Sequence, residues 1–365
     1  MARLNVGLIG LGRLGRVYAR DLAGRIPETR LVAVADPMGT LAKEVAEEFE
    51  APRAYTDPLE LIDDPVVEAI VIVTPTHIHR EQVIAAADRK KPTFCEKPPA
   101  LSLAELDGIA AAEQAGGGRF ATVFQHRFGS GAQTLRGLVA AGDPRFGEPM
   151  TAVCHTLWYR PDDYFAVPWR GSFEVEGGGP TMGHGIHQID LLLSILGGWQ
   201  QVVAVAARRA RPTATEDLSV AVVTMDSGAV VTIVNSLLSP REVTYLRFDF
   251  EHATVELEHL YGYSDEHWRV TATPGREAEV KAAWDEGPKG QASGHAAQLG
   301  AVVDALAAGT PPPVTLPDTR PTMELIAASY ASAFTGAPVR RGEIGTDSPF
   351  YHRMDGNGAP WEATA

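Results

Sequence analysis

A glycine-rich loop near the start of the chain has the spacing of a nucleotide-binding turn. Its letters are G-L-G-R-L-G, between a strand-like run at 3–9 and a helical stretch at 13–24. In this pattern the first glycine permits a tight turn, the second lets the main chain approach a pyrophosphate, and the third allows close packing of helix on strand. The helix N-terminus then directs N–H groups at the phosphates. We therefore expect the whole loop to bind a dinucleotide: Gly10, Leu11, Gly12, Arg13, Leu14 and Gly15.

An acidic residue, Asp36, ends the next strand-like run, at 30–36. A carboxylate in this position accepts hydrogen bonds from a ribose diol and repels a 2′-phosphate. The alternative is that Asp36-Pro37 only opens a turn and that Arg13 is available to bind a phosphate. The position at the strand end favours NAD over NADP as the cofactor, with Asp36 as the ribose anchor.

A second polar group lies in the segment G-H-G-I-H-Q-I-D, where His184, His187 and Asp190 recur at intervals of three. That interval places them near one face of a helix, which we expect at about 183–196. A metal site would need a further ligand, and no other Cys or His spacing supplies one, so no metal is expected. These residues are either satisfied polar groups of the core, with Asp190 capping or bracing the helix, or groups that contact a substrate.

Strand and helix patterns alternate through the first third of the chain and then change. This alternation predicts an α/β fold, a doubly wound parallel sheet of the Rossmann type. Its strands are expected at 3–9, 30–36, 66–73, 93–95 and 120–124, and its helices at 13–24, 39–49, 79–90 and 102–115.

Longer strands with period-two alternation begin at about residue 150. Asp226-Ser227-Gly228 between two of them fits a hairpin turn. We expect an α+β domain on a large, mostly antiparallel open sheet, and we expect a second copy to cover its broad exposed face in a homodimer or homotetramer. The predicted strands are 151–157, 201–207, 218–225, 229–235, 244–250 and 268–273, with helices at 183–196 and 318–335. The predicted domains are 1–125, 126–341 and a C-terminal tail at 342–365.

Composition excludes several classes of protein. The chain has 365 residues, 45% hydrophobic and 21% charged, which is typical of a globular protein of more than one domain. A net charge of -14 without a basic stripe argues against a nucleic-acid surface. No apolar run approaches the roughly 20 residues of a membrane span. Cys95 and Cys154 are expected to be reduced thiols in a cytoplasmic protein.

Several motifs together resemble one family. They are the glycine loop, C-E-K-P-P at Cys95–Pro99, T-P-x-x-x-H at Thr74–His79, W-R at Trp169–Arg170 and G-G-G-x-x-x-x-x-G-I-H-x-I-D at Gly177–Asp190. This set resembles the Gfo/Idh/MocA family of sugar and inositol oxidoreductases. The resemblance implies an NAD(P)-dependent enzyme that transfers a hydride to or from a carbohydrate, cyclitol or glycoside.

The resemblance also assigns roles to individual residues. Lys97 of the E-K-P motif is expected beside the nicotinamide, where it exchanges a proton with the substrate hydroxyl or carbonyl. His187 corresponds to the family's substrate-contacting histidine. Thr74, Pro75, Thr76, His79 and Glu96 are expected to line the cofactor, although His79 could instead be simply the first residue of a helix.

Two further segments supply candidate residues. Gln125, His126 and Arg127 follow the last strand of the first domain and should face the cleft between domains. In the long segment at 159–180, Trp169 is a candidate for stacking on cofactor or sugar, and Arg170 for reaching a phosphate or an acidic substrate group; ordinary loop contacts are the alternative. Gln125, Trp169 and Arg170 complete the predicted cofactor-binding set. The predicted substrate-binding residues are Lys97, Arg127, His155, Trp158, His184 and His187.

The chain departs from the family pattern at Gly183. The family has an aspartate four residues before the histidine, and glycine can neither accept a proton nor bind a hydroxyl. His184 is adjacent, but one helical step turns a side chain by about 100 degrees. Either His184 takes over from a shifted backbone, joining Lys97 and His187 as a catalytic residue, or the substrate lacks the group that aspartate would contact. Two alternatives to a dehydrogenase therefore stay open: a redox-assisted glycoside hydrolase or lyase, and a non-catalytic NAD-binding regulator.

Overall fold

The chain divides into two compact units. The computed structural model describes residues 3–167 and 169–361. The first unit runs as far as Ala100 and adds Glu105–Val123 and His295–Thr319; the second comprises Leu101–Ala104, Phe124–Gly294 and the chain from Arg320 onward. A late segment of the chain therefore returns to the first unit.

The first unit holds a six-stranded sheet in the order β3-β2-β1-β4-β5-β6, and every neighbouring pair is parallel. The predicted parallel α/β sheet is confirmed, and a short edge strand, β3, is added to it. β4 is buried along its whole length, as expected for a strand covered on both faces. The strands are β1 (Leu4–Ile9), β2 (Thr29–Ala35), β3 (Arg53–Tyr55), β4 (Ala69–Ile72), β5 (Thr93–Cys95) and β6 (Phe120–Thr122).

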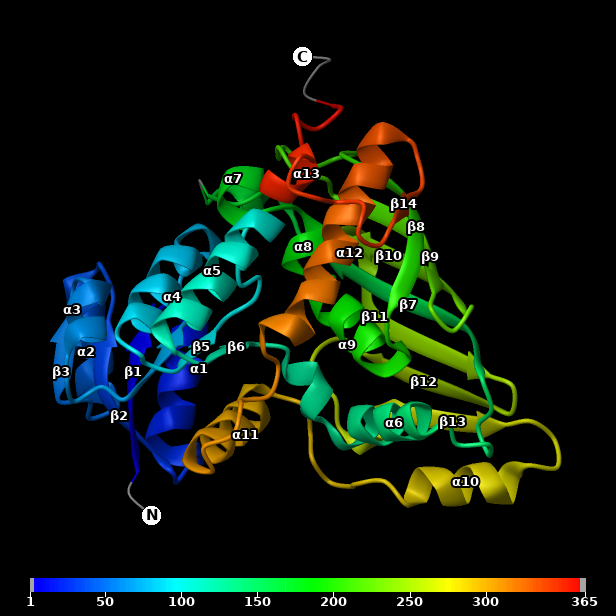
Figure 1. Ribbon diagram of the computed structural model, residues 1–365, viewed down its shortest axis with the longest axis horizontal. Helices are drawn as coiled ribbons and strands as arrows, with labels where there is room; N and C mark the ends of the chain where they lie inside the picture. The colour runs from blue at the N-terminus through cyan, green and yellow to red at the C-terminus, as the bar shows by residue number, and fades with distance from the viewer. Residues whose placement is uncertain (1–2, 168, 362–365) are drawn as a thin grey trace. The chain divides into compact units, whose positions relative to one another are not determined.

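The core of the first unit is shared between the sheet and a helix from the returning segment. Leu8, Val71 and Phe94 of the strands pack in one apolar cluster with Leu299 and Val303 of α11. Figure 1 shows this helix in gold among the blue elements of the first unit. The helices that begin in this unit's segments or flank its strands are α1 (Arg13–Arg20) with a π turn (Asp21–Arg25), α2 (Gly39–Glu48), α3 (Pro58–Asp63), the 3-10 turn η2 (Thr76–Ile78), α4 (His79–Asp88), α5 (Leu103–Gly116) and α11 (His295–Ala307).

The second unit is built on an eight-stranded sheet in the order β13-β12-β11-β7-β10-β9-β8-β14. Only the β10–β7 pair is parallel among the described pairs, so the predicted, mostly antiparallel sheet is confirmed. The turn at Asp226-Ser227-Gly228 joins β9 to β10 as expected. The strands are β7 (Pro149–Tyr159), β8 (Trp199–Ala207), β9 (Leu218–Met225), β10 (Val230–Ser236), β11 (Leu238–Phe250), β12 (Ala253–His259), β13 (Trp268–Ala272) and β14 (Val339–Arg340).

The helix expected at 183–196 is interrupted. The chain turns at His184 and Gly185, so that a short helix, α8, precedes α9. A side chain at Gly185 would overlap the amide oxygen of Asn235 on β10, which explains the glycine at the break. The prediction that His184 shares a helical face with His187 and Asp190 is therefore wrong. The helical segments here are η3 (Gln125–Phe128), α6 (Ser130–Ala141), η4 (Asp162–Phe165), α7 (Phe173–Glu176), α8 (Pro180–Gly183), α9 (Ile186–Leu196), η5 (Asp265–His267), α10 (Glu277–Asp285), α12 (Leu316–Thr335) and α13 (Pro349–His352).

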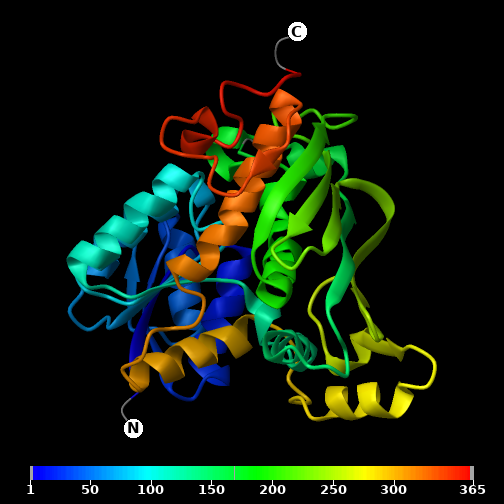
Figure 2. The same ribbon diagram turned by 45° about the vertical axis from the view of Figure 1, so that its right-hand side comes forward.

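The two faces of the larger sheet differ. On one face α9 packs on β7, and the Ala204 N–H of β8 donates to Ser332 Oγ of α12 at 3.0 Å. Figure 2 shows the orange α12 along this green sheet. On the other face, valines of β8, β9 and β10 are 41 to 66% exposed: Val203, Val205, Val220, Val222 and Val230. Within the part of the chain that the structure describes, no helix has both the length and the apolar character needed to cross a membrane.

Candidate active site

The glycine loop is shaped by packing at two of its glycines and open at the third. Gly10 has φ +90°, and a side chain there would press on the Val73 main chain at 2.7 Å. A side chain at Gly15 would overlap the Gly10 carbonyl oxygen. At Gly12, which caps α1, a Cβ would meet no atom within 4 Å. The fold therefore requires Gly10 and Gly15, whereas Gly12 leaves space at the helix N-terminus that fits a pyrophosphate.

Asp36 lies against this loop. Its Oδ2 accepts the Leu11 N–H at 2.9 Å, and its Oδ1 accepts the Met38 N–H at 2.9 Å. The half-buried carboxylate is thus held at the end of β2 beside the glycine turn, as a ribose anchor requires.

His79 joins two loops at the carboxyl edge of the sheet. The buried ring places Nδ1 2.8 Å from the Pro98 carbonyl oxygen and Nε2 2.7 Å from the Thr74 carbonyl oxygen. Burial lowers the pKa of His79, against the opposing effect of these two carbonyls. Both ring nitrogens therefore face main chain, and His79 is the first residue of α4. Its side chain positions the segments that carry Thr74 and Lys97, while the exposed Pro75 and half-buried Thr76 lie open between them.

Glu96 is buried behind Lys97. Its carboxylate accepts the Tyr18 hydroxyl at 2.8 Å and the Lys97 N–H at 3.0 Å, and it lies 3.4 Å from His295 Nε2. Burial disfavours the charged form, yet hydrogen bonding from His295 and the nearby charge of Lys97 hold the pKa of Glu96 below its usual value. Glu96 thus fixes the main chain of Lys97, whose own side chain is only half-buried. Neither His295 nor Tyr18 was predicted to belong to this arrangement.

In the second unit, His187 lies in an aromatic cluster. From α9 its ring meets the edges of His126 at 5.2 Å and Tyr261 at 5.7 Å between centroids. The His126 ring also packs on Tyr261 at 5.1 Å and Tyr263 at 4.4 Å. Neither tyrosine was predicted, although both stand in the period-two string L-Y-G-Y that follows β12.

His184 lies in the turn between α8 and α9 and packs elsewhere. Its ring contacts Trp158 at 5.2 Å and Tyr164 at 6.3 Å. At the neighbouring Gly183, a Cβ would meet no atom within 4 Å. The predicted substrate residues Trp158 and His184 are therefore brought together, beside a glycine at which a Cβ would be unhindered.

His155 is not part of this cluster. It precedes Trp158 by three residues on β7, so its side chain leaves the opposite face of the sheet. There its ring lies 6.3 Å from that of Tyr245. The structure therefore does not bring the predicted substrate residue His155 to the side that holds His184 and His187.

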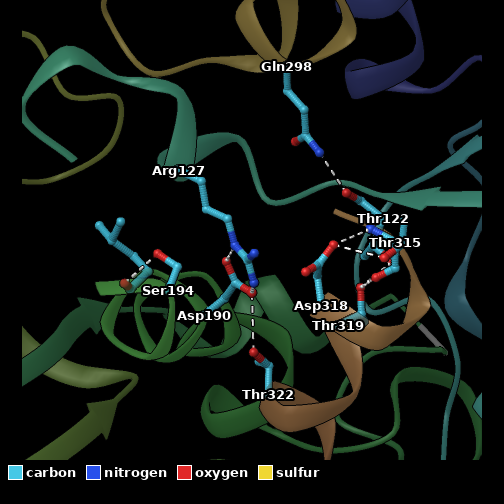
Figure 3. Close-up of polar contacts among 10 residues, drawn as sticks. Thr122, Arg127, Asp190, Ser194, Gln298, Thr315, Asp318, Thr319 and Thr322 are labelled. Carbon is cyan, nitrogen blue, oxygen red and sulfur yellow. Dashed lines mark hydrogen bonds and ion pairs between the residues drawn. The ribbon is translucent and has the colours of Figure 1, made fainter. Parts of the chain in front are cut away.

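Arg127 and Asp190 form a buried, two-pronged ion pair (Figure 3). Arg127 Nε donates to Asp190 Oδ2 at 2.7 Å, and Arg127 Nη2 donates to Asp190 Oδ1 at 2.5 Å. Thr322 Oγ1 donates to the same carboxylate at 3.2 Å. The exposed fractions of the two charged side chains are 11% and 1%. Asp190 therefore braces α9, and the guanidinium of Arg127, predicted to meet the substrate, is engaged in this pair.

Figure 3 also draws a threonine network of the first unit. Thr319 Oγ1 donates to Thr122 Oγ1 at 2.9 Å, and Gln298 Nε2 donates to the Thr122 carbonyl at 2.7 Å. These bonds tie β6 to the returning segment, which supplies His295 beside Glu96.

The long segment after β7 forms a stack of alternating rings and guanidinium groups. Arg160 lies 4.9 Å from the Trp158 ring and 5.4 Å from that of Tyr164. Arg170 lies 4.0 Å from the Tyr164 ring and 4.3 Å from that of Trp169, and it pairs with Glu176 at 3.6 Å. Trp169 and Arg170 are thus ordered within the second unit by this stack. Their predicted contact with a cofactor stays a prediction.

Gln125 is buried next to the aromatic cluster. Its Nε2 donates to the Tyr261 hydroxyl at 2.5 Å, and its Oε1 has no hydrogen-bond partner among the described residues. Among residues 3–167 and 169–361, no group of three or more His, Cys, Asp or Glu side chains is placed to hold a metal ion.

Two protein-family models match the chain. Residues 4–124 match the oxidoreductase family GFO_IDH_MocA, NAD-binding Rossmann fold, and residues 132–257 match the GFO/IDH/MocA C-terminal domain. Two relatives are the myo-inositol 2-dehydrogenase of Thermotoga maritima, 33% identical over 53% of this chain and 55% of the relative, and the scyllo-inositol 2-dehydrogenase (NAD(+)) of Bacillus subtilis, 32% identical over 53% and 54%. The chain spans about half the length of these curated relatives.

Solved structures share the fold over nearly the whole chain. The WlbA dehydrogenase from Bordetella pertussis, in complex with NADH and UDP-GlcNAcA, has a TM-score of 0.82 at 23% identity, covering 93% of this chain and 98% of that one. A levoglucosan dehydrogenase in complex with NADH has a TM-score of 0.80 at 20% identity, covering 94% and 100%. The chain belongs to the GFO/IDH/MocA oxidoreductase family, and its first unit is that family's NAD-binding Rossmann fold.

Proposed function

We propose that the protein is an NAD-dependent oxidoreductase that transfers a hydride between nicotinamide and a CH–OH carbon of a sugar, cyclitol or glycoside. The observation that carries this proposal is Lys97, which follows β5 at the carboxyl edge of an NAD-binding sheet with its main chain fixed by the buried Glu96. Ligands of such sheets bind at that edge. The names of the inositol and levoglucosan dehydrogenases among the relatives support the substrate class.

The residues of the first unit fit the cofactor. The open position at Gly12 and the N-terminus of α1 would hold the pyrophosphate, and Asp36 would hold the adenosine ribose. Thr74–Thr76 would line the nicotinamide side. When bound, nicotinamide supplies the hydride acceptor.

Proton transfer falls to Lys97. As the substrate alcohol becomes a carbonyl, its C–H leaves as a hydride, and Lys97 Nζ takes the hydroxyl proton; in the reverse direction it returns that proton. His187 is proposed to orient the substrate, and the Arg127–Asp190 pair to hold the helix that carries it.

Serine in place of Asp36 tests the cofactor assignment. We expect the unchanged protein to bind NAD at least about tenfold more tightly than NADP, a difference of about 1.4 kcal/mol. Asp36→Ser should narrow that gap because it removes the charge that repels a 2′-phosphate. Titration calorimetry with both cofactors measures the two dissociation constants. Equal constants in the unchanged protein would show that Asp36 does not select NAD.

A second candidate function is redox-assisted cleavage of a glycoside. In this route the C3 hydroxyl is oxidised, its hydride passes to NAD, and the C2 proton becomes acidic. A base removes that proton while the anomeric group leaves and takes up a proton. Water then adds at C1, a proton returns to C2, and the hydride returns to C3. The observation that favours it is His184, which lies outside α9 against Trp158 and Tyr164, beside the open position at Gly183. Histidine, with an ordinary pKa of about 6.5, suits such a base near neutral pH. A non-catalytic regulator is less consistent with an intact Lys97.

Alanine in place of His184 distinguishes these routes. If His184 is the second base, His184→Ala should lower glycoside cleavage by about 100-fold, the lower end for a lost acid-base group. The exposed His352, whose Nε2 meets only the Thr346 carbonyl oxygen at 2.8 Å, gives the matched control His352→Ala. Turnover of His184→Ala equal to that of the control would remove His184 from the mechanism.

We further propose that a second copy of the chain covers the exposed valine face of β8, β9 and β10. Val205 is 66% exposed and Val203 47%, and apolar surface of this kind on a broad sheet is normally buried by a partner.

A further inference from the structure

We propose that Tyr261 is a substrate-contacting residue and that Gln125 orients its hydroxyl. This inference rests on the proposed function, because it assigns a contact within the same reaction.

The first observation is the exposure of Tyr261. Its side chain is 41% exposed, whereas its neighbours in the cluster, His126, His187 and Tyr263, are 1 to 3% exposed. Its ring packs on His126 at 5.1 Å, on His187 at 5.7 Å and on Trp158 at 6.2 Å. Tyr261 is therefore the member of this cluster that combines contact with His187 and access to a small molecule.

The second observation is the hydrogen bond from Gln125. Gln125 is 1% exposed, and its Nε2 lies 2.5 Å from the Tyr261 hydroxyl oxygen. This contact holds the Tyr261 hydroxyl at a fixed position, as a group that orients a substrate oxygen requires. A buried amide that leaves its own Oε1 without a described partner carries an energetic cost, which is expected where polar groups serve binding.

The third observation is that Trp158 links Tyr261 to the second predicted substrate histidine. The Trp158 ring lies 6.2 Å from that of Tyr261 and 5.2 Å from that of His184. Tyr261 therefore belongs to the same group of rings as His184 and His187, the two histidines predicted to contact the substrate.

Phenylalanine in place of Tyr261 keeps the ring on His126 and His187 and removes only the hydroxyl. With the best substrate among myo-inositol, levoglucosan, D-glucose and D-glucuronate, we expect Tyr261→Phe to lower kcat/KM about tenfold, as for a lost hydrogen bond. The dissociation constant for NAD should stay unchanged, whereas the thermal unfolding midpoint should fall, because the buried Nε2 of Gln125 loses its acceptor. Tyr351→Phe on α13 is the control, because it also removes a phenolic hydroxyl, from a residue that was not assigned to the site.

Monodeoxy analogues of the same substrate identify the contact. For the unchanged protein, one analogue should lose about as much kcat/KM as Tyr261→Phe does, and for that analogue Tyr261→Phe should add no further loss. A structural role would lower kcat/KM on every analogue alike, and this outcome overturns the inference. Equal kcat/KM of Tyr261→Phe and the unchanged protein on the parent substrate also overturns it. Failure of the unchanged protein to reduce NAD with any panel member would instead overturn the proposed function.

Discussion

Methionine in place of Lys97 is expected to lower turnover by at least about 100-fold while leaving NAD affinity within a few-fold. Methionine keeps the length and apolar stem of the side chain but can neither take nor return a proton. The buried carboxylate of Glu96 still accepts the main-chain N–H at position 97, so the loop should keep its place. Steady-state absorbance of reduced nicotinamide measures turnover, and titration calorimetry measures NAD binding.

The matched control is Lys43→Met on the exposed surface of α2, which removes one positive charge from the same unit. It should leave turnover unchanged. If Lys97→Met keeps near-normal turnover on the best substrate, proton transfer belongs to another group.

Methionine in place of Arg127 is expected to lower the free energy of unfolding by about 3–5 kcal/mol, because it leaves the buried Asp190 carboxylate without its charged partner. The Asp190 side chain is 1% exposed, and Thr322 Oγ1 would still donate to it. Urea unfolding followed by circular dichroism measures the change.

Two further variants separate the buried charge from lost packing. Arg247 pairs with Asp249 on the sheet with exposed fractions of 43% and 21%, so Arg247→Met should cost only about 0–1 kcal/mol. In the double variant Arg127→Met, Asp190→Leu, no buried charge is left unpaired, and most of the stability should return. If Arg127→Met is as stable as the unchanged protein, the ion pair between Arg127 and Asp190 does not brace α9.

Local pattern was sufficient to predict the two sheets and the nucleotide loop. The alternation of strands and helices follows from burial on both faces of a parallel sheet, and Gly15 is required by the Gly10 carbonyl of its own loop. The hairpin at Asp226-Ser227-Gly228 is equally local. Gly10 was predicted from its motif, although the contact that requires it is with the Val73 main chain after β4.

The need for glycine at position 185 could not be predicted from the segment itself. It depends on Asn235 of β10, whose side-chain amide would overlap a side chain at 185. The interval of three residues assumed one continuous helix. In the folded chain α8 ends at Gly183 and α9 begins at Ile186, so His184 does not share the helical face of His187. His155 was misplaced for a different reason: the alternation of β7 is local, and it puts His155 and Trp158, three residues apart, on opposite faces of the sheet.

Contacts from distant segments explain the residues that the sequence analysis missed. His295 reaches Glu96 only because residues 295–319 return to the first unit. Tyr261 meets His187 through packing of two elements about 70 residues apart, as in any non-local core contact. His79 was assigned to the cofactor by motif, whereas its ring is held by two main-chain carbonyls.

The most direct test of the central claim is to count reduced cofactor during turnover in deuterated water. The protein is incubated with NAD and the panel of myo-inositol, levoglucosan, D-glucose and D-glucuronate, together with aryl glycosides. Absorbance gives the amount of reduced nicotinamide, and mass spectrometry gives deuterium at C2. We expect one reduced nicotinamide for each substrate molecule oxidised and no deuterium at C2. Free aglycone with C2 deuterium and no net reduction, or no reaction with any panel member, would contradict the assignment as an NAD-dependent dehydrogenase.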